Sequence, residues 1–338
     1  MRIAAEEARV LARTLLERAG APQAHAMLQA DVLLEGELRG HPSHGLQRLP
    51  RLLTRIERRL ADPAASGTHA WRKAGMLEVD GNAGLGPVVA TRAIDALLAR
   101  VGETGVAVAA VRNANHLGML AGYVERIAAA GSVGVALSTS EALVHPHGGT
   151  RAMLGTNPIA VAVPSSDAPF VLDLATSVVS MGKIHDHALR GASIPQGWAL
   201  DEDGAPTTDA ARAKSGAIAP FGGAKGYALG LAFELLVAAL AGSAFAPDVR
   251  GTLDAENKAN KGDVFIVVEP NAAPDLAARI SGYLDALRSS RAADADRPVT
   301  VPGDGARARR EAALQNGIEV PDQLWQDLHS RLSKDTQS

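Results

Sequence analysis

Ser43, His44 and Arg48 lie close together in the segment HPSHGLQRLP and suit one kind of chemistry. A guanidinium grips a carboxylate with two parallel hydrogen bonds, and an imidazole exchanges a proton with a nearby oxygen. A hydroxyl beside the imidazole orients it or relays the proton. Together these groups suit the reduction of a carbonyl that stands next to a carboxylate. Taken alone, the same residues also fit a capped helix start with a surface histidine.

Two further polar residues lie in predicted turns of an α/β sheet. His116 follows the apolar run 106–111 in NANHLG, at a strand-to-helix turn of the kind where ligands meet such sheets. Thr156 precedes another apolar run in GTNPIAVAVPS and offers donors to a substrate carboxylate. A lone histidine or threonine in a turn is more often structural, so both interpretations stay open.

Two other segments have residue types that bind nucleotides. LDLATS ends a predicted strand and places Asp173, Thr176 and Ser177 where ribose hydroxyls or phosphate could be bound. FGGAKGYALG is rich in glycine, includes Lys225 and leads into a long apolar helix. Backbone amides at a helix start and one ammonium suit a pyrophosphate. A flexible turn with a solvated lysine explains the second segment equally well.

The segment GNAGLG, residues 81–86, imitates a dinucleotide-binding turn but has the wrong spacing. It reads G-x-x-G-x-G, and the strand that follows ends at Arg112 and Asn113, where a Rossmann fold usually has an acidic residue for the ribose. We therefore interpret it as a turn where the backbone passes close to another segment.

Two H-x-H pairs raise a competing hypothesis, a metal-dependent hydrolase. His145 and His147 form one pair, and His185 and His187 form the other. Such pairs bind divalent metals when a strand fixes their geometry, but both lie in loop-like contexts without clear carboxylate partners. We expect no metal site. A serine hydrolase is less favoured still, because the chain has no G-x-S-x-G elbow.

The elements that must position these residues are of two kinds. Apolar spacing of three to four predicts helices, and short apolar runs between turn signals predict strands, an alternation typical of an α/β protein. Predicted helices cover 4–19, 23–39, 46–60, 86–101, 117–130, 225–241, 274–289, 304–315 and 321–333. Predicted strands are Met76–Val79, Val106–Val111, Val133–Leu137, Ile159–Val163, Val171–Leu174 and Val264–Val268, with a short extended piece at 298–301.

The distribution of these elements predicts two domains in the 338 residues. Residues 1–70 form a helical domain that 285–338 complete, and residues 71–284 form the α/β domain that binds cofactor and substrate.

Composition narrows the class of protein. Hydrophobic residues make up 46% and charged residues 21%, as in an ordinary globular enzyme, and a net charge of −3 gives no case for nucleic acid. Because cysteine is absent, disulfides and thiolate chemistry are excluded. The charged N-terminal segment lacks the apolar core of a signal peptide, and no apolar run comfortably spans a bilayer. We expect a cytoplasmic protein without membrane partners.

Taken in order along the chain, several motifs resemble the malate/L-lactate dehydrogenase family of the second type. These motifs are SHGLQRLP, VDGNAGLG, NANHLG, GTNPIAVAVP, LDLATS, PQGWALDEDG and GGAKGYALGLAFELL. The family includes ureidoglycolate, sulfolactate and diketogulonate enzymes and the piperideine/pyrroline-2-carboxylate reductases. The resemblance implies a nicotinamide-dependent oxidoreductase with a non-Rossmann cofactor domain built on a mixed sheet. It also implies a homodimer.

By position, the resemblance gives His44 the role of proton donor, with Ser43 as its relay. Arg48 matches the clamp on the substrate carboxylate, Thr156 a substrate contact, and His116 a catalytic residue beside the nicotinamide. The positions expected to bind the cofactor are His116, Leu117, Gly118, Glu141, Asp173, Leu174, Ala175, Thr176, Lys225, Gly226, Gly303 and Asp304.

Glu141 and His147 are departures from the family pattern. If Glu141 lies beside the adenosine ribose it repels a 2′-phosphate, which favours NAD, with NADP as the alternative. His147 stands where we expect another residue, in a variable part of the pocket. The predicted reaction is hydride transfer at C2 of a small 2-hydroxy or 2-oxo acid. Reduction of a cyclic imine carboxylate is the alternative, because both substrates present a carboxylate beside an unsaturated carbon.

Overall fold

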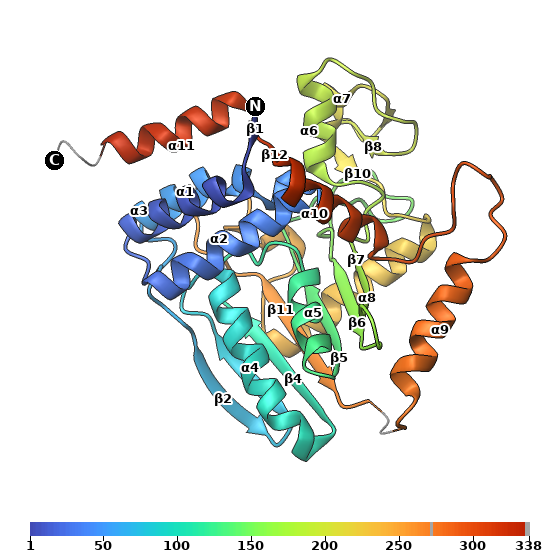
Figure 1. Cartoon of the computed structure of the whole chain (residues 1–338). Coiled ribbons are helices and arrows are strands. Elements are labelled where there is room, and N and C mark those ends of the chain that lie inside the picture. The colour runs from blue at the N-terminus through green and yellow to red at the C-terminus, as the bar shows by residue number, and fades with distance from the viewer. Residues whose placement is uncertain (271–272, 335–338) are drawn as a thin grey trace.

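The computed structural model describes residues 1–270 and 273–334, and a mixed β-sheet lies at its centre (Figure 1). Within these residues seven strands are ordered β2-β3-β4-β11-β5-β6-β7. β3 and β4 run parallel, and the other neighbouring pairs are antiparallel. Their bounds are β2 Thr68–Lys73, β3 Met76–Asp80, β4 Val106–Arg112, β5 Val133–Ser138, β6 Ile159–Val163, β7 Phe170–Leu174 and β11 Gly262–Val268.

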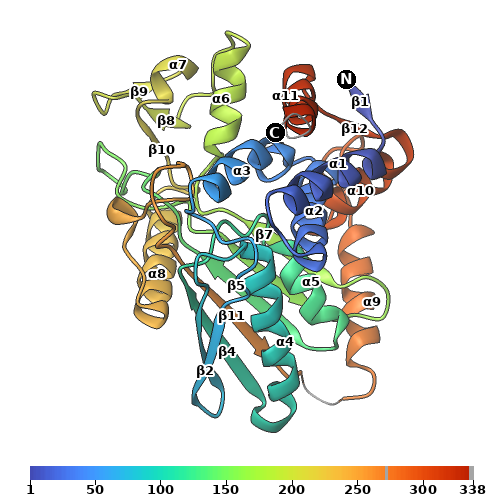
Figure 2. The ribbon, with the colours of Figure 1, turned by 90° about the vertical axis from the view of Figure 1, so that its left-hand side faces the viewer.

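Helices cover both faces of this sheet (Figure 2). α4 (Gly86–Thr104) and α5 (Ala121–Ala129) pack on one face around a core that includes Ile94, Leu97 and Ile127. α8 (Ala224–Ala241) covers the other face, where Val237 meets Leu137 and Val264. A central strand covered on both faces has no polar side, which explains why these strands read as continuous apolar runs.

A helical layer lies across one end of the sheet and joins the two ends of the chain. α1 (Ala5–Arg18), α2 (Gln23–Leu38) and α3 (Leu49–Glu57) share a core with α11 (Asp322–Lys334). β1 (Arg2–Ile3) pairs with β12 (Ile318–Glu319), and α10 (Asp304–Asn316) crosses α2. The tail therefore packs on the helical start, as expected. The boundaries at 70 and 285 stay predictions.

A third group of elements was not predicted from the sequence. α6 (Met181–Leu189), α7 (Ala210–Ala213) and a small sheet of β8 (Ala199–Leu200), β9 (Pro206–Thr207) and β10 (Ala217–Ile218) share a core of their own. Two-residue strands are too short to show alternation. The fully exposed edge strand β2 gives no apolar signal either. The extended piece expected at 298–301 forms no strand. The helix that precedes it, α9 (Leu276–Arg288), lies at the edge of the molecule (Figure 1).

One end of the sheet collects the segments that matter for function. Arg112 at the end of β4 pairs with Gly262 at the start of β11, and Ser138 at the end of β5 pairs with Asp263. Leu174 at the end of β7 pairs with Ile159 at the start of β6. The loops that follow or precede these residues therefore meet at the same end of the sheet.

Candidate active site

The loop with Ser43 and His44 joins α2 to α3, as predicted. It forms two 3₁₀ turns, Pro42–His44 and Leu46–Arg48, separated by Gly45. The Ser43 hydroxyl lies 3.1 Å from Nδ1 of His44, within hydrogen-bond distance. Because this contact occupies Nδ1, the other ring nitrogen, Nε2, is the one available to a ligand.

Arg48 is held by backbone carbonyls instead of by an acid. Its Nε donates to the Ser43 carbonyl at 2.8 Å, and Nη1 donates to the Thr252 carbonyl at 3.0 Å. Nη2 has no acceptor among the described residues. A partly buried guanidinium without an ion-pair partner suits an anionic ligand, because an unpaired charge in the interior is costly until it is matched.

His116 faces His44 across the site. The ring centroids lie 5.5 Å apart, tilted by 41°. The Gly118 N–H donates to Nδ1 of His116 at 3.0 Å, so the proton of the neutral ring is on Nε2. Gly86 permits this arrangement, because a Cβ there would meet the carbonyl oxygens of Asn115 and His116. The turn at 81–86 is thus a close backbone approach, as interpreted.

The electrostatics keep both imidazoles neutral. Burial, with the positive charge of Arg48, lowers the pKa of His44 to about 3. Burial also holds the pKa of His116 well below its ordinary value, with smaller contributions from Arg48 and the Lys261 ammonium. Burial and the neighbouring Arg51 lower the pKa of Arg48 to about 10, and the negative charge of Glu141 opposes this shift. At neutral pH the site therefore combines a charged guanidinium with two neutral imidazoles.

Three residues of this site were not singled out in the sequence. Arg51, Arg55 and Asn115 line a cavity of about 40 Å³ together with Arg48 and His116. Arg55 donates to the Asn115 side chain at 3.1 Å, and Asn115 in turn donates to backbone carbonyls of the 81–86 turn. Exposed Arg51 has no hydrogen bond or ion pair among the described residues. Arginines at 48, 51 and 55 follow helical spacing, a signal that the sequence did offer.

That cavity is only large enough for water molecules, so a substrate must also use the open side of the site. Thr156 lies on the neighbouring loop, where its N–H donates to the Ser140 hydroxyl at 3.1 Å. Its carbonyl accepts from the backbone and the hydroxyl of Thr176, at 2.8 and 2.9 Å. These bonds join the loop before β6 to the end of β7, and Thr176 is buried within them.

The other predicted cofactor residues differ in how open they are. Exposed Asp173 accepts from the Ala121 N–H at the start of α5, at 2.7 Å, and Leu174 and Ala175 follow it half-buried. Exposed Lys225 stands in the first turn of α8, a helix start without a side-chain cap, and has no partner among the described residues. Gly226 is buried against the Phe221 carbonyl, and Leu117 is buried in the core.

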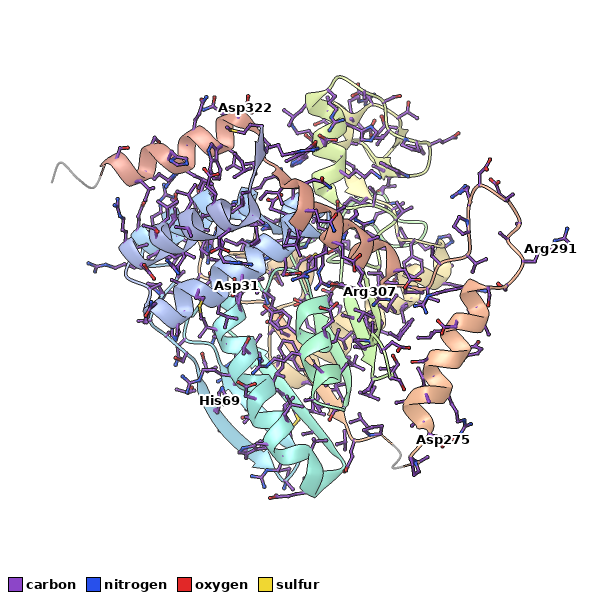
Figure 3. All side chains as sticks on the ribbon, viewed as in Figure 1. Asp31, His69, Asp275, Arg291, Arg307 and Asp322 are labelled. Carbon is purple, nitrogen blue, oxygen red and sulfur yellow. The ribbon has the colours of Figure 1, made fainter. Side chains whose placement is uncertain are left out.

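Glu141 and Asp304 already accept hydrogen bonds from other residues of the protein. Glu141 accepts from the Thr252 hydroxyl and from the N–H groups of Thr252 and Leu253, at 2.8 and 2.9 Å. Asp304, preceded by Gly303 with φ +97°, accepts hydrogen bonds from Arg288 and Arg307. Arg307, on α10 (Figure 3), also donates to the Pro169 carbonyl. These guanidinium hydrogen bonds hold the pKa of Asp304 well below its usual range. Both carboxylates thus have partners within the protein, and their cofactor roles stay predictions.

The second histidine pair, His185 and His187, lies on helix α6 and not in a loop, so that expectation was wrong. His145 Nδ1 lies 2.8 Å from the Pro146 carbonyl, and His187 Nδ1 lies 2.8 Å from that of Ser193. Among residues 1–270 and 273–334 no three His, Asp or Glu side chains are grouped to hold a metal ion. The geometry therefore provides no ligand set for the metal-hydrolase alternative.

Comparison with known proteins identifies the family. The model for malate/L-lactate dehydrogenase matches residues 3–329. The chain belongs to the malate/L-lactate dehydrogenase family. It is therefore a dehydrogenase or reductase, and both the resemblance and the predicted α/β fold with a mixed sheet are confirmed.

Relatives within this family differ in their named activities. The L-sulfolactate dehydrogenase of Methanocaldococcus jannaschii is 34% identical over 93% of this chain and 91% of its own length. A delta(1)-pyrroline-2-carboxylate reductase of Ancylobacter novellus is 33% identical over 98% and 97%. The solved structure of a dehydrogenase from Sinorhizobium meliloti has a TM-score of 0.95 and 57% identity, covering 98% of each chain. Membership of the family alone therefore does not choose the substrate.

Proposed function

We propose that the chain transfers a hydride between a nicotinamide cofactor and C2 of a small 2-oxo or 2-hydroxy carboxylic acid. The observation that carries this proposal is Arg48, a guanidinium without an acid partner that stands beside two neutral imidazoles. A substrate carboxylate supplies the missing anion. Its neighbouring carbon then lies on the side of the loop where His44 and His116 face each other.

His44 is the proton carrier in this proposal. With its pKa lowered to about 3 in the free protein, the neutral ring is ready to accept the hydroxyl proton of a 2-hydroxy acid. In the reducing direction it must donate a proton instead. A bound carboxylate helps, because it offsets the charge of Arg48 and raises the pKa of His44. Ser43, within hydrogen-bond distance of Nδ1, orients the ring or relays the proton.

His116 contributes a hydrogen-bond donor. Because Gly118 occupies its Nδ1, the Nε2–H of the neutral ring is free to point at the substrate oxygen or at the nicotinamide. The Lys261 ammonium, buried with the Asp263 carboxylate beneath this loop, disfavours protonation of the ring. His116 therefore orients and polarises, while His44 exchanges the proton.

The residues present fit a nicotinamide dinucleotide. The uncapped first turn of α8 with exposed Lys225 suits a pyrophosphate, and exposed Asp173 suits ribose hydroxyls. Gly222 has no atom within 4 Å of the place that a Cβ would take, which leaves open space beside that turn. The cofactor, when bound, accepts or supplies the hydride. We keep NAD as the proposed cofactor and NADP as the alternative, although the hydrogen bonds from Thr252 to Glu141 weaken the charge argument for NAD.

The favoured substrate has a second anionic group. Arg51 lines the same cavity as Arg48 and has no acid partner among the described residues. A 2-oxo acid with a second carboxylate or a sulfonate uses both guanidiniums. Relatives named malate dehydrogenase and L-sulfolactate dehydrogenase act on such acids by name. A cyclic imine carboxylate is the alternative, since it needs Arg48 alone.

We also propose that the protein is a cytoplasmic homodimer. α8 is apolar apart from Lys225 and Glu234, and it leaves Leu229, Leu235 and Leu236 exposed on its outer face, with Phe245 just beyond its end. By length and composition this helix passes as a membrane span, but its inner face packs on the sheet, where Val237 meets Leu137 and Val264. A second copy over the outer face removes this apolar surface from water.

The test follows nicotinamide absorbance while the purified protein meets 2-oxo acids with and without a second anionic group, and cyclic imine carboxylates. Each is offered with NADH and with NADPH. The proposal predicts the fastest cofactor oxidation with the doubly anionic 2-oxo acids. Faster reduction of cyclic imines selects the alternative, and a substrate-dependent activity that chelators abolish without cofactor use selects the hydrolase. No cofactor oxidation with any substrate rejects the proposal.

A further inference from the structure

The second half of α2 is in direct backbone contact with the catalytic loop. A Cβ on Gly36 would stand 2.8 Å from the backbone of His44 and Gly45, so no side chain fits there. A Cβ on Gly45 would meet the carboxylate of Glu37. Two glycines thus let the helix and the loop touch, and one carboxylate closes the contact.

Glu37 is bound to the loop through a single hydrogen bond. The Leu46 N–H donates to Oε1 of Glu37 at 2.7 Å. Leu46 opens the second 3₁₀ turn, which ends at Arg48 and lies next to His44 across Gly45. The bond therefore fixes the turn that connects His44, the proposed proton carrier, to Arg48, the proposed carboxylate clamp.

The charged groups near this part of α2 have other partners. Glu35 and Arg39 pair with each other, and with Arg310 of α10 and Glu125 of α5. Arg309 of α10 donates to the Arg39 carbonyl, and His41, His44 and Arg48 belong to the loop itself. None of these groups sets the ionisation of Glu37. Burial raises the pKa of Glu37 to about 7, and the Leu46 N–H opposes that rise.

Resting on the function proposed above, we propose that Glu37 is a positioning residue of the reaction. Its ionised carboxylate holds the second turn of the loop and so sets where His44 and Arg48 stand. A hydrogen bond to an ionised acceptor is stronger than one to a neutral acceptor. Protonation of Glu37 therefore loosens the turn without any change in the substrate or in the imidazoles, which stay neutral in this pH range.

The first experiment measures kcat and KM against pH for the wild type and Glu37→Gln. We expect wild-type kcat/KM to fall by roughly 3- to 10-fold as pH drops through about 7, the difference between a charged and a neutral acceptor. Because the loop positions both groups, kcat and KM both change. Glu37→Gln keeps an oxygen acceptor but cannot ionise. Its kcat/KM should therefore not change near pH 7, and should stay near the value that the wild type has at acidic pH. Glu57→Gln, an exposed carboxyl at the end of α3, is the matched control and keeps the wild-type profile.

A second readout does not depend on activity. The imidazole nitrogen signals of His44, assigned by their loss in His44→Gln, should shift with a midpoint near pH 7 in the wild type and not in Glu37→Gln. The melting temperature measures the effect of Glu37 ionisation on stability, independently of activity. Since the folded-state pKa of Glu37 is raised, the stability due to its proton is present at acidic pH and lost as pH rises toward 7. Glu37→Gln therefore gains melting temperature relative to the wild type at alkaline pH.

The outcomes separate the two proposals. If no substrate is turned over but the His44 signals follow Glu37, the proposed function fails and the positioning role stands. If Glu37→Gln keeps the acid limb of the wild type, or its His44 signals still shift near pH 7, Glu37 does not position the loop.

Discussion

Two arginines at the two ends of one short stretch have opposite surroundings. Arg39, at the end of α2, is bound by Glu35 and by both oxygens of Glu125, at 2.6 and 2.7 Å, and these carboxylates hold its pKa above the ordinary value. Arg48 meets only backbone carbonyls, and its pKa is lowered to about 10. The first guanidinium is satisfied by the protein itself. The second has no ion-pair partner among the described residues.

Each arginine also has a histidine beside it. Burial lowers the pKa of both rings, with smaller contributions from the charges of Arg309 and Arg39 at His41 and of Arg48 at His44. Both rings have a lowered pKa, so a shifted pKa alone does not distinguish a catalytic histidine from a structural one. What distinguishes them is the unpaired charge next to His44. The two histidines therefore differ in the partners of the neighbouring guanidinium and not in the direction of their pKa shift.

The largest effect is expected for the histidine pair. His44→Gln should lower kcat by roughly 10²- to 10⁴-fold, the usual contribution of a general acid or base. His41→Gln should leave kcat near the wild-type value, because its ring lies in the Arg39 region. Steady-state kinetics of both variants measures the difference. Equal losses in the two variants would remove the assigned role of His44.

The arginine pair sharpens the comparison through KM. Arg48→Lys replaces a planar fork with a point charge, and should raise the KM of the carboxylate substrate by roughly 10- to 100-fold, as for lost charged hydrogen bonds. Arg39→Lys should leave KM unchanged. Titration of substrate at saturating cofactor checks both values. An unchanged KM in Arg48→Lys contradicts the clamp.

The two arginines should rank in the opposite order when the free energy of unfolding is measured instead of KM. Arg39→Met leaves two carboxylates without their cation and should lower the free energy of unfolding by about 1–3 kcal/mol, between the values for exposed and buried pairs. Arg48→Met removes an unpaired charge and should leave stability unchanged or raise it. Thermal melting of the two variants at equal pH decides this. A larger loss in Arg48→Met than in Arg39→Met breaks the comparison.

The smallest effect is a ligand-linked pKa change. In the free protein the His44 and His116 rings should stay neutral from about pH 8 down to about pH 5, because burial and Arg48 oppose protonation. Adding oxamate with reduced cofactor should raise the pKa of His44, since the bound carboxylate cancels the charge of Arg48. Imidazole nitrogen NMR in the two states is the measurement. A His44 pKa that does not move on binding would argue against a carboxylate at Arg48.

The sequence predicted the long elements and the site loop, because both depend on local patterns. The central strands and α8 are continuous apolar runs, and the hydroxyl, imidazole and guanidinium of the 43–48 loop are neighbours along the chain. Asp304 was predicted to bind the cofactor from the family resemblance, and its ion pair with Arg288, sixteen positions earlier on another helix, gives no local signal in the sequence. The contact between Glu141 and Thr252 could not be predicted either, because the two residues are remote in sequence. The small sheet beside α6 was not predicted because its strands are only two residues long.

The account depends on one geometric claim, that a substrate carboxylate pairs with Arg48 while its reacting carbon lies between two imidazoles. A crystal structure with bound nicotinamide cofactor and oxamate tests this most directly. We predict carboxylate oxygens within about 2.6–3.2 Å of the Arg48 guanidinium and the adjacent oxygen within the same reach of His44 Nε2. An oxamate bound elsewhere, with Arg48 still facing only Ser43 and Thr252, would contradict the account.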